Sequence, residues 1–142
     1  MVNNPRRALW TPPPVPLPDE GPARRKVGPI YDLPTVQELV TSGGGQIYTA
    51  TDRCEDDLVK LEWDVGDVAK LIAALKAEDY HVSEWCKGRG GAVIDADAYT
   101  IRYDHLEECR GNLRHAQYYI KFGFRNNDPR LIVWVFSCHL SS

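Results

Sequence analysis

The chain has 142 residues and a mass of 16.1 kDa, the size of one domain, and 43% of its residues are apolar, enough for one core. No stretch approaches the ~20 apolar residues of a membrane-spanning helix, and the N-terminus lacks the apolar segment typical of secretory signals. Four scattered cysteines do not suit a disulfide framework. These features predict a soluble, cytoplasmic protein with no membrane partner.

The net charge of −3 is unevenly distributed along the chain. Residues 1–27 carry five basic and two acidic side chains, residues 28–80 carry four and eleven, and residues 81–142 carry eight and seven. A protein that coats nucleic acid without sequence preference is normally basic overall. If this chain binds RNA, we therefore expect it to use a local patch in the final third.

Residues 1–28 are predicted to form a Pro-rich flexible arm, and residues 29–142 a single domain. Seven of the first 28 residues are proline, which favours extended polyproline II conformation. The few apolar side chains there bury too little surface to offset the entropy of ordering. The pattern is typical of a linker or tail, with a partner-binding peptide as the alternative.

Three helices are expected in the first half of the domain. Asp32 is a suitable N-cap for the first, which the glycines at 43–45 end. A short strand at 47–49 precedes a polar helix at 52–60. The third helix begins after Asp64 and has apolar residues at helical spacing: Val65, Val68, Leu71, Ile72 and Leu75.

From residue 80 onward the apolar pattern changes to a period of two, which predicts strands at 80–86, 97–104 and 117–124. The run at 131–140 is apolar on both faces, which predicts an interior strand. A turn at 126–129 pairs the last two strands antiparallel. Helices followed by strands predict an α+β domain, in which N-terminal helices pack on one face of a mostly antiparallel four- to five-stranded sheet.

Strand alternation predicts which side chains share the opposite face of that sheet. If Ile101 and Ile120 point toward the helices, the other face carries Thr100, Arg102, Tyr119 and Lys121. Two cations, a phenol and a hydroxyl suit a phosphodiester, because the cations hold the phosphate and the phenol donates a hydrogen bond or stacks on a base. The alternative is an ordinary solvated sheet face.

Other candidate catalytic or phosphate-binding side chains lie nearby in the sequence. His81 and His139 are candidate general acid–base groups, because imidazole titrates near neutral pH. The segment 87–92 resembles a hairpin loop rather than a nucleotide-phosphate loop, and its Lys87 and Arg89 are candidates for phosphate contact. No CxxC pair occurs, so no metal site is expected and the cysteines are better explained as core residues.

Four short strings, in this order, resemble the MqsR-type toxins (motility quorum-sensing regulators), relatives of the RelE-like ribonucleases. YDL at 31–33 corresponds to the family's start before its first helix, and DYHVSEW at 79–85 to its FYKSM-like string. AYTIRY at 98–103 corresponds to a WQDVY-like strand, and YYIKF at 118–122 to a VYLKI-like strand. The resemblance covers about residues 30–140.

This resemblance implies a RelE-like fold and a toxin that cleaves messenger RNA without a metal and is held inactive by a cognate antitoxin. The family's active-site positions are a lysine in FYKSM, a glutamine in WQDVY and a tyrosine in VYLKI. Tyr119 matches the tyrosine, whereas Thr100 stands at the glutamine position and Val82 at the lysine position. Valine neither holds a phosphate nor moves a proton.

Three explanations are open for Val82. His81, one residue earlier, takes the role of the lysine through a bulge or a change of register. Alternatively, Lys87 or Lys121 supplies the cation from elsewhere. In the third explanation the protein is inactive.

The sequence thus predicts a metal-independent endoribonuclease (mRNA interferase) toxin of a type II toxin–antitoxin pair, with no cofactor. The residues predicted to be catalytic are His81, Tyr119, Arg102 and Lys121. The residues predicted to bind substrate are Thr100, Lys87 and Arg89. The expected partners are messenger RNA and an antitoxin that masks the basic sheet face. The alternative is a catalytically inactive homologue that acts as an RNA- or protein-binding module.

Overall fold

The computed structural model describes residues 5–8, 10–11, 13, 23–25, 28–42, 46–102, 117–126 and 128–140. Its helices are α1 (Leu33–Thr41), α2 (Asp52–Leu61) and α3 (Val65–Ala74), with short 3₁₀ turns at Ala77–Asp79 and Arg89–Gly91. Its strands are β1 (Ala23–Arg25), β2 (Gln46–Thr49), β3 (Tyr80–Lys87), β4 (Val93–Arg102), β5 (Gln117–Gly123) and β6 (Ile132–Leu140).

Each of the three helices begins at a side chain that caps it. Asp32 accepts a hydrogen bond from the Thr35 amide at 3.2 Å, and the Thr51 hydroxyl accepts one from the Cys54 amide at 3.0 Å. Asp64 and Asp67 cap reciprocally, each carboxylate accepting from the other's backbone amide. Such caps satisfy amides that have no partner inside the helix, so the helix starts follow from local sequence.

The sheet has six strands in the order β1-β3-β4-β5-β6-β2. The α+β class is confirmed. The sheet has six strands rather than the expected four or five, and it is mixed, because β2 joins the edge parallel to β6. The pairs β1–β3, β3–β4, β4–β5 and β5–β6 are antiparallel. The direction of β2 depends on a pairing between residues 46–49 and 132–135, which no local pattern encodes.

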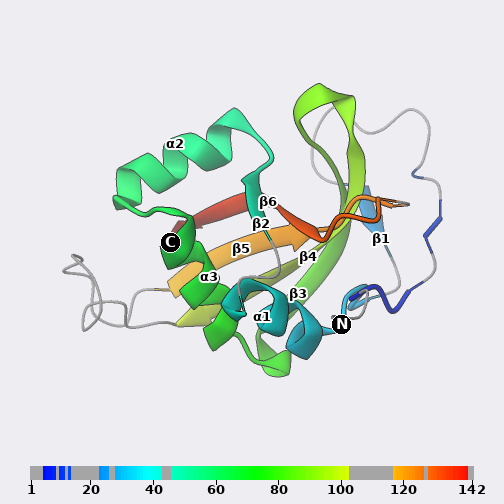
Figure 1. Ribbon diagram of the computed structural model, residues 1–142, viewed down its shortest axis with the longest axis horizontal. Helices are drawn as coiled ribbons and strands as arrows, with labels where there is room; N and C mark the ends of the chain where they lie inside the picture. Colours follow the sequence, from blue (N-terminus) through cyan, green and yellow to red (C-terminus); the bar gives the residue numbers. More distant parts are fainter. Residues whose placement is uncertain are drawn as a thin grey trace.

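One face of the sheet is covered by the helices. Figure 1 shows α1 and α3 over this face, with α2 packed along β6. All three helices contribute to one buried apolar cluster with β4, β5 and β6. Its fully buried members include Val36, Leu39, Cys54, Val68, Leu71, Ile72, Ile120, Phe122, Val133, Val135 and Cys138.

The N-terminal segment differs from the predicted flexible arm at two places. Residues 23–25 form β1 on the edge of the sheet. Residues 5–8 pack on the domain, where the Arg7 and Ala8 amides donate to the Ile30 carbonyl at 2.6 and 3.1 Å. The Arg6 guanidinium pairs with the buried Asp95 carboxylate. These residues are held by hydrogen bonds and an ion pair. The small number of apolar side chains in residues 1–28 therefore does not predict that they attach to the domain.

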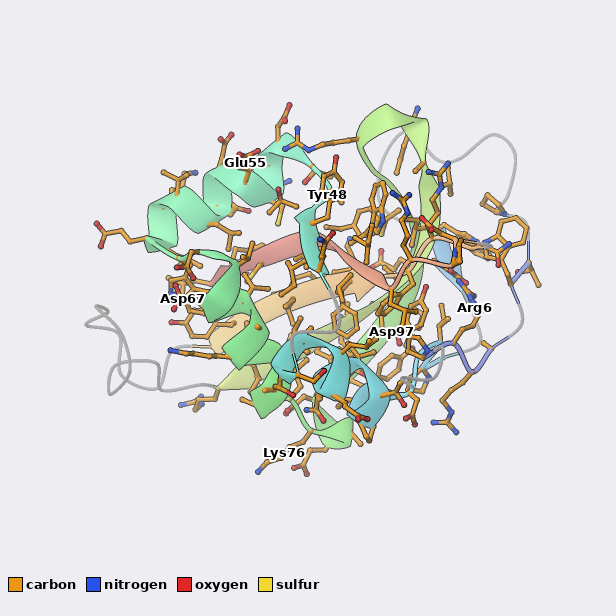
Figure 2. The ribbon with its side chains drawn as sticks, in the orientation of Figure 1. Arg6, Tyr48, Glu55, Asp67, Lys76 and Asp97 are labelled. Carbon is orange, nitrogen blue, oxygen red and sulfur yellow. The ribbon has the colours of Figure 1, made fainter. Side chains whose placement is uncertain are left out.

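A second buried carboxylate fastens the start of the domain to the sheet. Asp97 accepts hydrogen bonds from the Ile30 and Tyr31 amides and from the Ser83 hydroxyl. Burial raises the pKa of Asp97 above its ordinary value, and these hydrogen bonds oppose the rise. In Figure 2, Asp97 lies inside the fold and Arg6 lies at the side formed by the N-terminal segment.

No helix of the described ranges covers the other face of the sheet, which we call the open face. At one end of it the β3–β4 hairpin meets the start of α2. Arg89 in the hairpin forms ion pairs with Asp52 and Glu55 of α2. A smaller apolar cluster fills the space beneath this contact: Ala50, Cys86, Ile94, Ala96, Trp134 and Phe136. Gly90 and Gly91 make the hairpin turn with positive φ angles. Among the described residues, no helix combines the length and apolar character needed to cross a membrane.

Candidate functional site

The strand register gathers the polar side chains of β4 and β5 on the open face. Thr100 lies opposite Tyr119, Arg102 lies opposite Gln117, and Lys121 lies opposite Ala98. Their neighbours Tyr99, Ile101 and Ile120 belong to the helix-side core. Thr100, Arg102, Tyr119 and Lys121 therefore share one face, as alternation predicts.

A β-bulge in β6 sets the position of a histidine on this face. Lys121 pairs with Ser137 and Phe122 pairs with Val135, so Phe136 is the extra residue. The bulge lets His139 lie directly opposite Tyr119. The two rings stack with their centroids 5.2 Å apart and their planes inclined by 20°.

The hydrogen bond of His139 defines which ring nitrogen is available for chemistry. Its Nδ1 lies 2.8 Å from the Leu140 carbonyl oxygen. Because a carbonyl only accepts, Nδ1 carries the proton in this contact. In the neutral ring Nε2 then has a free lone pair, so it can accept a proton from a substrate.

Tyr119 and Lys121 line a hollow on the open face with a volume of about 510 Å³. Four elements or their ends supply its wall: Thr51 and Arg53 from the start of α2, Glu84 to Lys87 from β3, Tyr119 and Lys121 from β5, and Phe136 from β6. We call this the main hollow. Its cationic side chains are Arg53, Lys87 and Lys121.

Lys121 of β5 and Cys86 of β3 lie on either side of β4 and interact electrostatically. Burial raises the pKa of the Cys86 thiol to about 11, and the nearby Lys121 opposes this rise. The residues of β4 between Cys86 and Lys121 are Ala96 and Ala98, which are fully buried and have small side chains. The main hollow therefore has an ammonium group close to the β3 side chains.

A second hollow, with a volume of about 330 Å³, adjoins the first. It is lined by Arg53, Asp57, Lys60, Leu61, His139 and Leu140. Arg53 lines both hollows, and the stacked Tyr119 and His139 rings line one each. Arg53 and the ring stack thus lie where the two hollows meet.

Several residues predicted from sequence do not line the main hollow. His81 sits exposed in a β-bulge of β3, two strands or about 10 Å from β5, and does not line the main hollow. Arg102 is exposed and lies outside the main hollow, and Thr100 does not line it either. Arg89 is held by Asp52 and Glu55, so its charge is already compensated.

The structure also adds residues that the sequence did not identify as functional. Arg53 reaches the hollows because α2 packs along β6, and Glu84 reaches the main hollow because of the hairpin register. Val82 of β3, at the position that the resemblance assigns to a lysine, pairs with Ala98 of β4. No pattern within a single element signals these placements.

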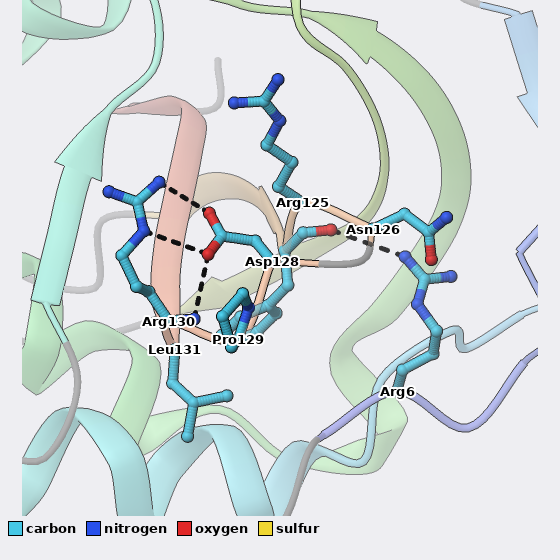
Figure 3. A pocket seen from close by; sticks show the side chains of 8 residues that line it. Arg6, Arg125, Asn126, Asp128, Pro129, Arg130 and Leu131 are labelled. Atoms are coloured by element: carbon cyan, nitrogen blue, oxygen red, sulfur yellow. Dashed lines mark hydrogen bonds and ion pairs between the residues drawn. The ribbon is translucent and has the colours of Figure 1, made fainter.

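A further hollow lies at the β5–β6 turn and is rich in arginine. It is lined by Arg6, Phe124, Arg125, Asn126, Asp128, Pro129, Arg130 and Leu131 (Figure 3). Arg130 is bound by Asp128, and Arg6 is bound by Asp95. Two of its three arginines therefore already have carboxylate partners.

No protein-family model and no curated protein matches this chain. Within the described part of the chain, no three His, Cys, Asp or Glu side chains gather into a group able to hold a metal ion. The geometry of the open face is therefore the basis for a functional proposal.

Proposed function

We propose that this protein is a metal-independent endoribonuclease, an mRNA interferase toxin of a type II toxin–antitoxin pair with a RelE-like fold. The observation that carries this proposal is the Tyr119–His139 stack beside Lys121 and Arg53 on an open sheet face. A phenol, an imidazole with a free nitrogen and two cations can supply the proton transfer and the charge stabilisation that phosphodiester cleavage requires. Of this set, Tyr119 is the residue that also stands at an active-site position in the resemblance to MqsR-type toxins.

RNA supplies its own nucleophile for the reaction. The ribose 2′-oxygen attacks the adjacent phosphorus and loses its proton, while the bond from phosphorus to the 5′-oxygen breaks and that oxygen gains a proton. The products are a 2′,3′-cyclic phosphate and a 5′-hydroxyl end. The protein needs to move two protons and to stabilise negative charge on the phosphate, and no cofactor takes part.

The available groups fit these tasks. His139 accepts the 2′-hydroxyl proton through Nε2, because Nδ1 is engaged with the Leu140 carbonyl. The Tyr119 hydroxyl donates a hydrogen bond to the phosphate or protonates the leaving oxygen. Lys121 and Arg53 stabilise the developing charge. In this assignment His139 takes the role that the sequence favoured for His81.

The test is incubation of the purified protein with long RNA in the presence of EDTA. We expect discrete fragments with cyclic phosphate ends. Tyr119→Phe and His139→Ala should each lower the cleavage rate about 10²- to 10⁴-fold, the range typical of acid–base groups. Tyr48→Phe is the matched control, since Tyr48 is a partly exposed tyrosine on the edge strand β2.

His81→Ala separates the two histidine assignments. If His139 is the base, His81→Ala retains cleavage, whereas loss of cleavage with His81→Ala and not with His139→Ala would return the role to His81. Unchanged cleavage in both Tyr119→Phe and His139→Ala would contradict the proposed site.

The inactive homologue is the second candidate, and Val82 is the observation that favours it. A valine in β3 leaves that position without the expected lysine. Intact RNA together with stable RNA binding by the wild type would support this binding module. In that case Val82→Lys should restore toxicity, measured as growth arrest on expression.

A toxin of this class requires a partner that keeps it inactive. We expect the antitoxin to cover the main hollow, because a bound chain there blocks Tyr119 and Lys121. Copurification of a small acidic protein, lost when Lys121 and Arg53 are both replaced by glutamate, would test this partner.

A further inference from the structure

Glu84 is a buried carboxylate that the proposed mechanism does not use. Its side chain is 3% exposed and lines the main hollow. One of its oxygens, Oε2, has no hydrogen-bond partner among the described residues. Buried polar atoms are nearly always hydrogen-bonded, and a buried carboxylate without a donor is costly. Its position at the hollow therefore points to a ligand that donates a hydrogen bond.

The surroundings of Glu84 restrict the kind of ligand. Tyr119 and Phe136 line the same hollow and provide aromatic surface. The volume of about 510 Å³ falls in the range of about 300–1,000 Å³ that small-molecule sites occupy. An aromatic wall with one buried acceptor suits a flat ring that carries an N–H donor, as protein sites for unstacked RNA bases do.

We propose that the main hollow binds a nucleobase with an exocyclic amino group, and that Glu84 accepts a hydrogen bond from this group. The inference rests on the proposed function, since Lys121 holds the phosphate in the same hollow and the base lies next to it. Adenine, cytosine and guanine carry an amino group. Uracil has its single ring N–H between two carbonyl oxygens, which repel a carboxylate.

The site should discriminate between bases, because a base without an amino group leaves the buried Glu84 carboxylate without a hydrogen-bond donor, which costs binding free energy. A site built around a buried hydrogen-bonding group rejects a ligand that lacks the partner group much more strongly than an apolar site rejects a missing methylene. The pair cytosine and uracil is a sharp comparison, because the amino group of cytosine is replaced by a carbonyl oxygen in uracil and the neighbouring ring nitrogen gains a hydrogen. Guanine and hypoxanthine form a second pair, which differs by loss of the amino group alone.

The first experiment measures binding of nucleoside 3′-monophosphates by calorimetry, so it does not depend on cleavage. We expect the wild type to bind CMP about tenfold to a hundredfold more tightly than UMP, and GMP more tightly than IMP. Glu84→Gln should bring CMP and UMP within about threefold, because an amide presents both a donor and an acceptor. Glu78→Gln, a change of the same kind at an exposed residue, should keep the wild-type preference.

The second experiment measures cleavage of short RNAs that differ at one base beside the scissile phosphate. Wild-type protein should prefer the amino-bearing base, and Glu84→Gln should relax this preference. A rate loss in Glu84→Gln that is equal on all substrates, together with loss of the acid limb of the pH–rate profile, would assign Glu84 to proton transfer and overturn the proposal. Equal binding of CMP and UMP by the wild type would also overturn it.

The two proposals fail separately in these experiments. Absence of cleavage with a retained preference for CMP over UMP refutes the nuclease and supports base binding. Cleavage with no base preference refutes base binding alone. Glu84→Gln keeps the side-chain shape and removes a buried charge, so we expect it to fold, and thermal unfolding checks this. If it does not fold, the comparison of CMP with UMP on the wild type still decides.

Discussion

Replacing Arg6 by alanine should remove a large part of the protein's stability. The guanidinium nitrogens lie 2.6 and 2.8 Å from the two carboxylate oxygens of Asp95, whose side chain has no exposed surface. The truncation leaves the Asp95 charge buried without this guanidinium. Breaking one side of a buried ion pair costs about 3–5 kcal/mol. Since the whole free energy of unfolding of a domain is on the order of 5–15 kcal/mol, the loss is easy to measure.

Urea unfolding followed by tryptophan fluorescence provides the assay, because the chain has four tryptophans. The matched control is Arg7→Ala, a change of the same kind at an exposed residue next to Arg6, which should alter the free energy of unfolding by less than about 0.5 kcal/mol. The double variant Arg6→Ala/Asp95→Asn removes both charges and should be more stable than Arg6→Ala alone. Equal midpoints for Arg6→Ala and Arg7→Ala would refute the reasoning.

Three further predictions concern packing and titration. Gly123→Ala should lower the free energy of unfolding by about 1–3 kcal/mol or more, because an added Cβ lies 2.6 Å from the Asp95 carbonyl oxygen; an unchanged urea midpoint would contradict this. The raised pKa of Asp97 means that the folded state holds its proton more tightly than the unfolded state. The contribution of Asp97 to the free energy of unfolding is therefore present below pH 3.8 and is lost as the pH rises through the native pKa. Asp97→Asn should remove this pH dependence of the free energy of unfolding. The same pH dependence in the wild type and in Asp97→Asn would argue against the raised pKa. Burial raises the pKa of Cys54 and of Cys86 to about 11. Iodoacetamide at pH 8 should therefore label both thiols slowly in the native state and rapidly in urea, as mass spectrometry of each cysteine can measure. Rapid labelling in the native state would disprove their burial.

The candidate site was only partly predictable from sequence. Alternation along β4 and β5 assigns Tyr119 and Lys121 to the face away from the helices, because successive side chains of a strand point to opposite faces. Pairing of His139 with Tyr119 depends instead on the bulge at Phe136, and a shift of one residue turns a side chain to the other face. His139 was a candidate from its chemistry, but only the pairing distinguishes it from His81.

By itself, the sequence determined the features that depend on short-range physics. Asp32 and Asp64 begin helices because a capping carboxylate acts within one turn, and the period of two marks β4 and β5 because pleating is a local property. Only the tertiary structure decided that β2 runs parallel to β6, that Arg6 pairs with Asp95 at a separation of 89 residues, and that Glu84 borders the same hollow as Tyr119. Such contacts depend on how whole elements pack and exclude water, and that choice is made by the complete core rather than by any segment of the chain.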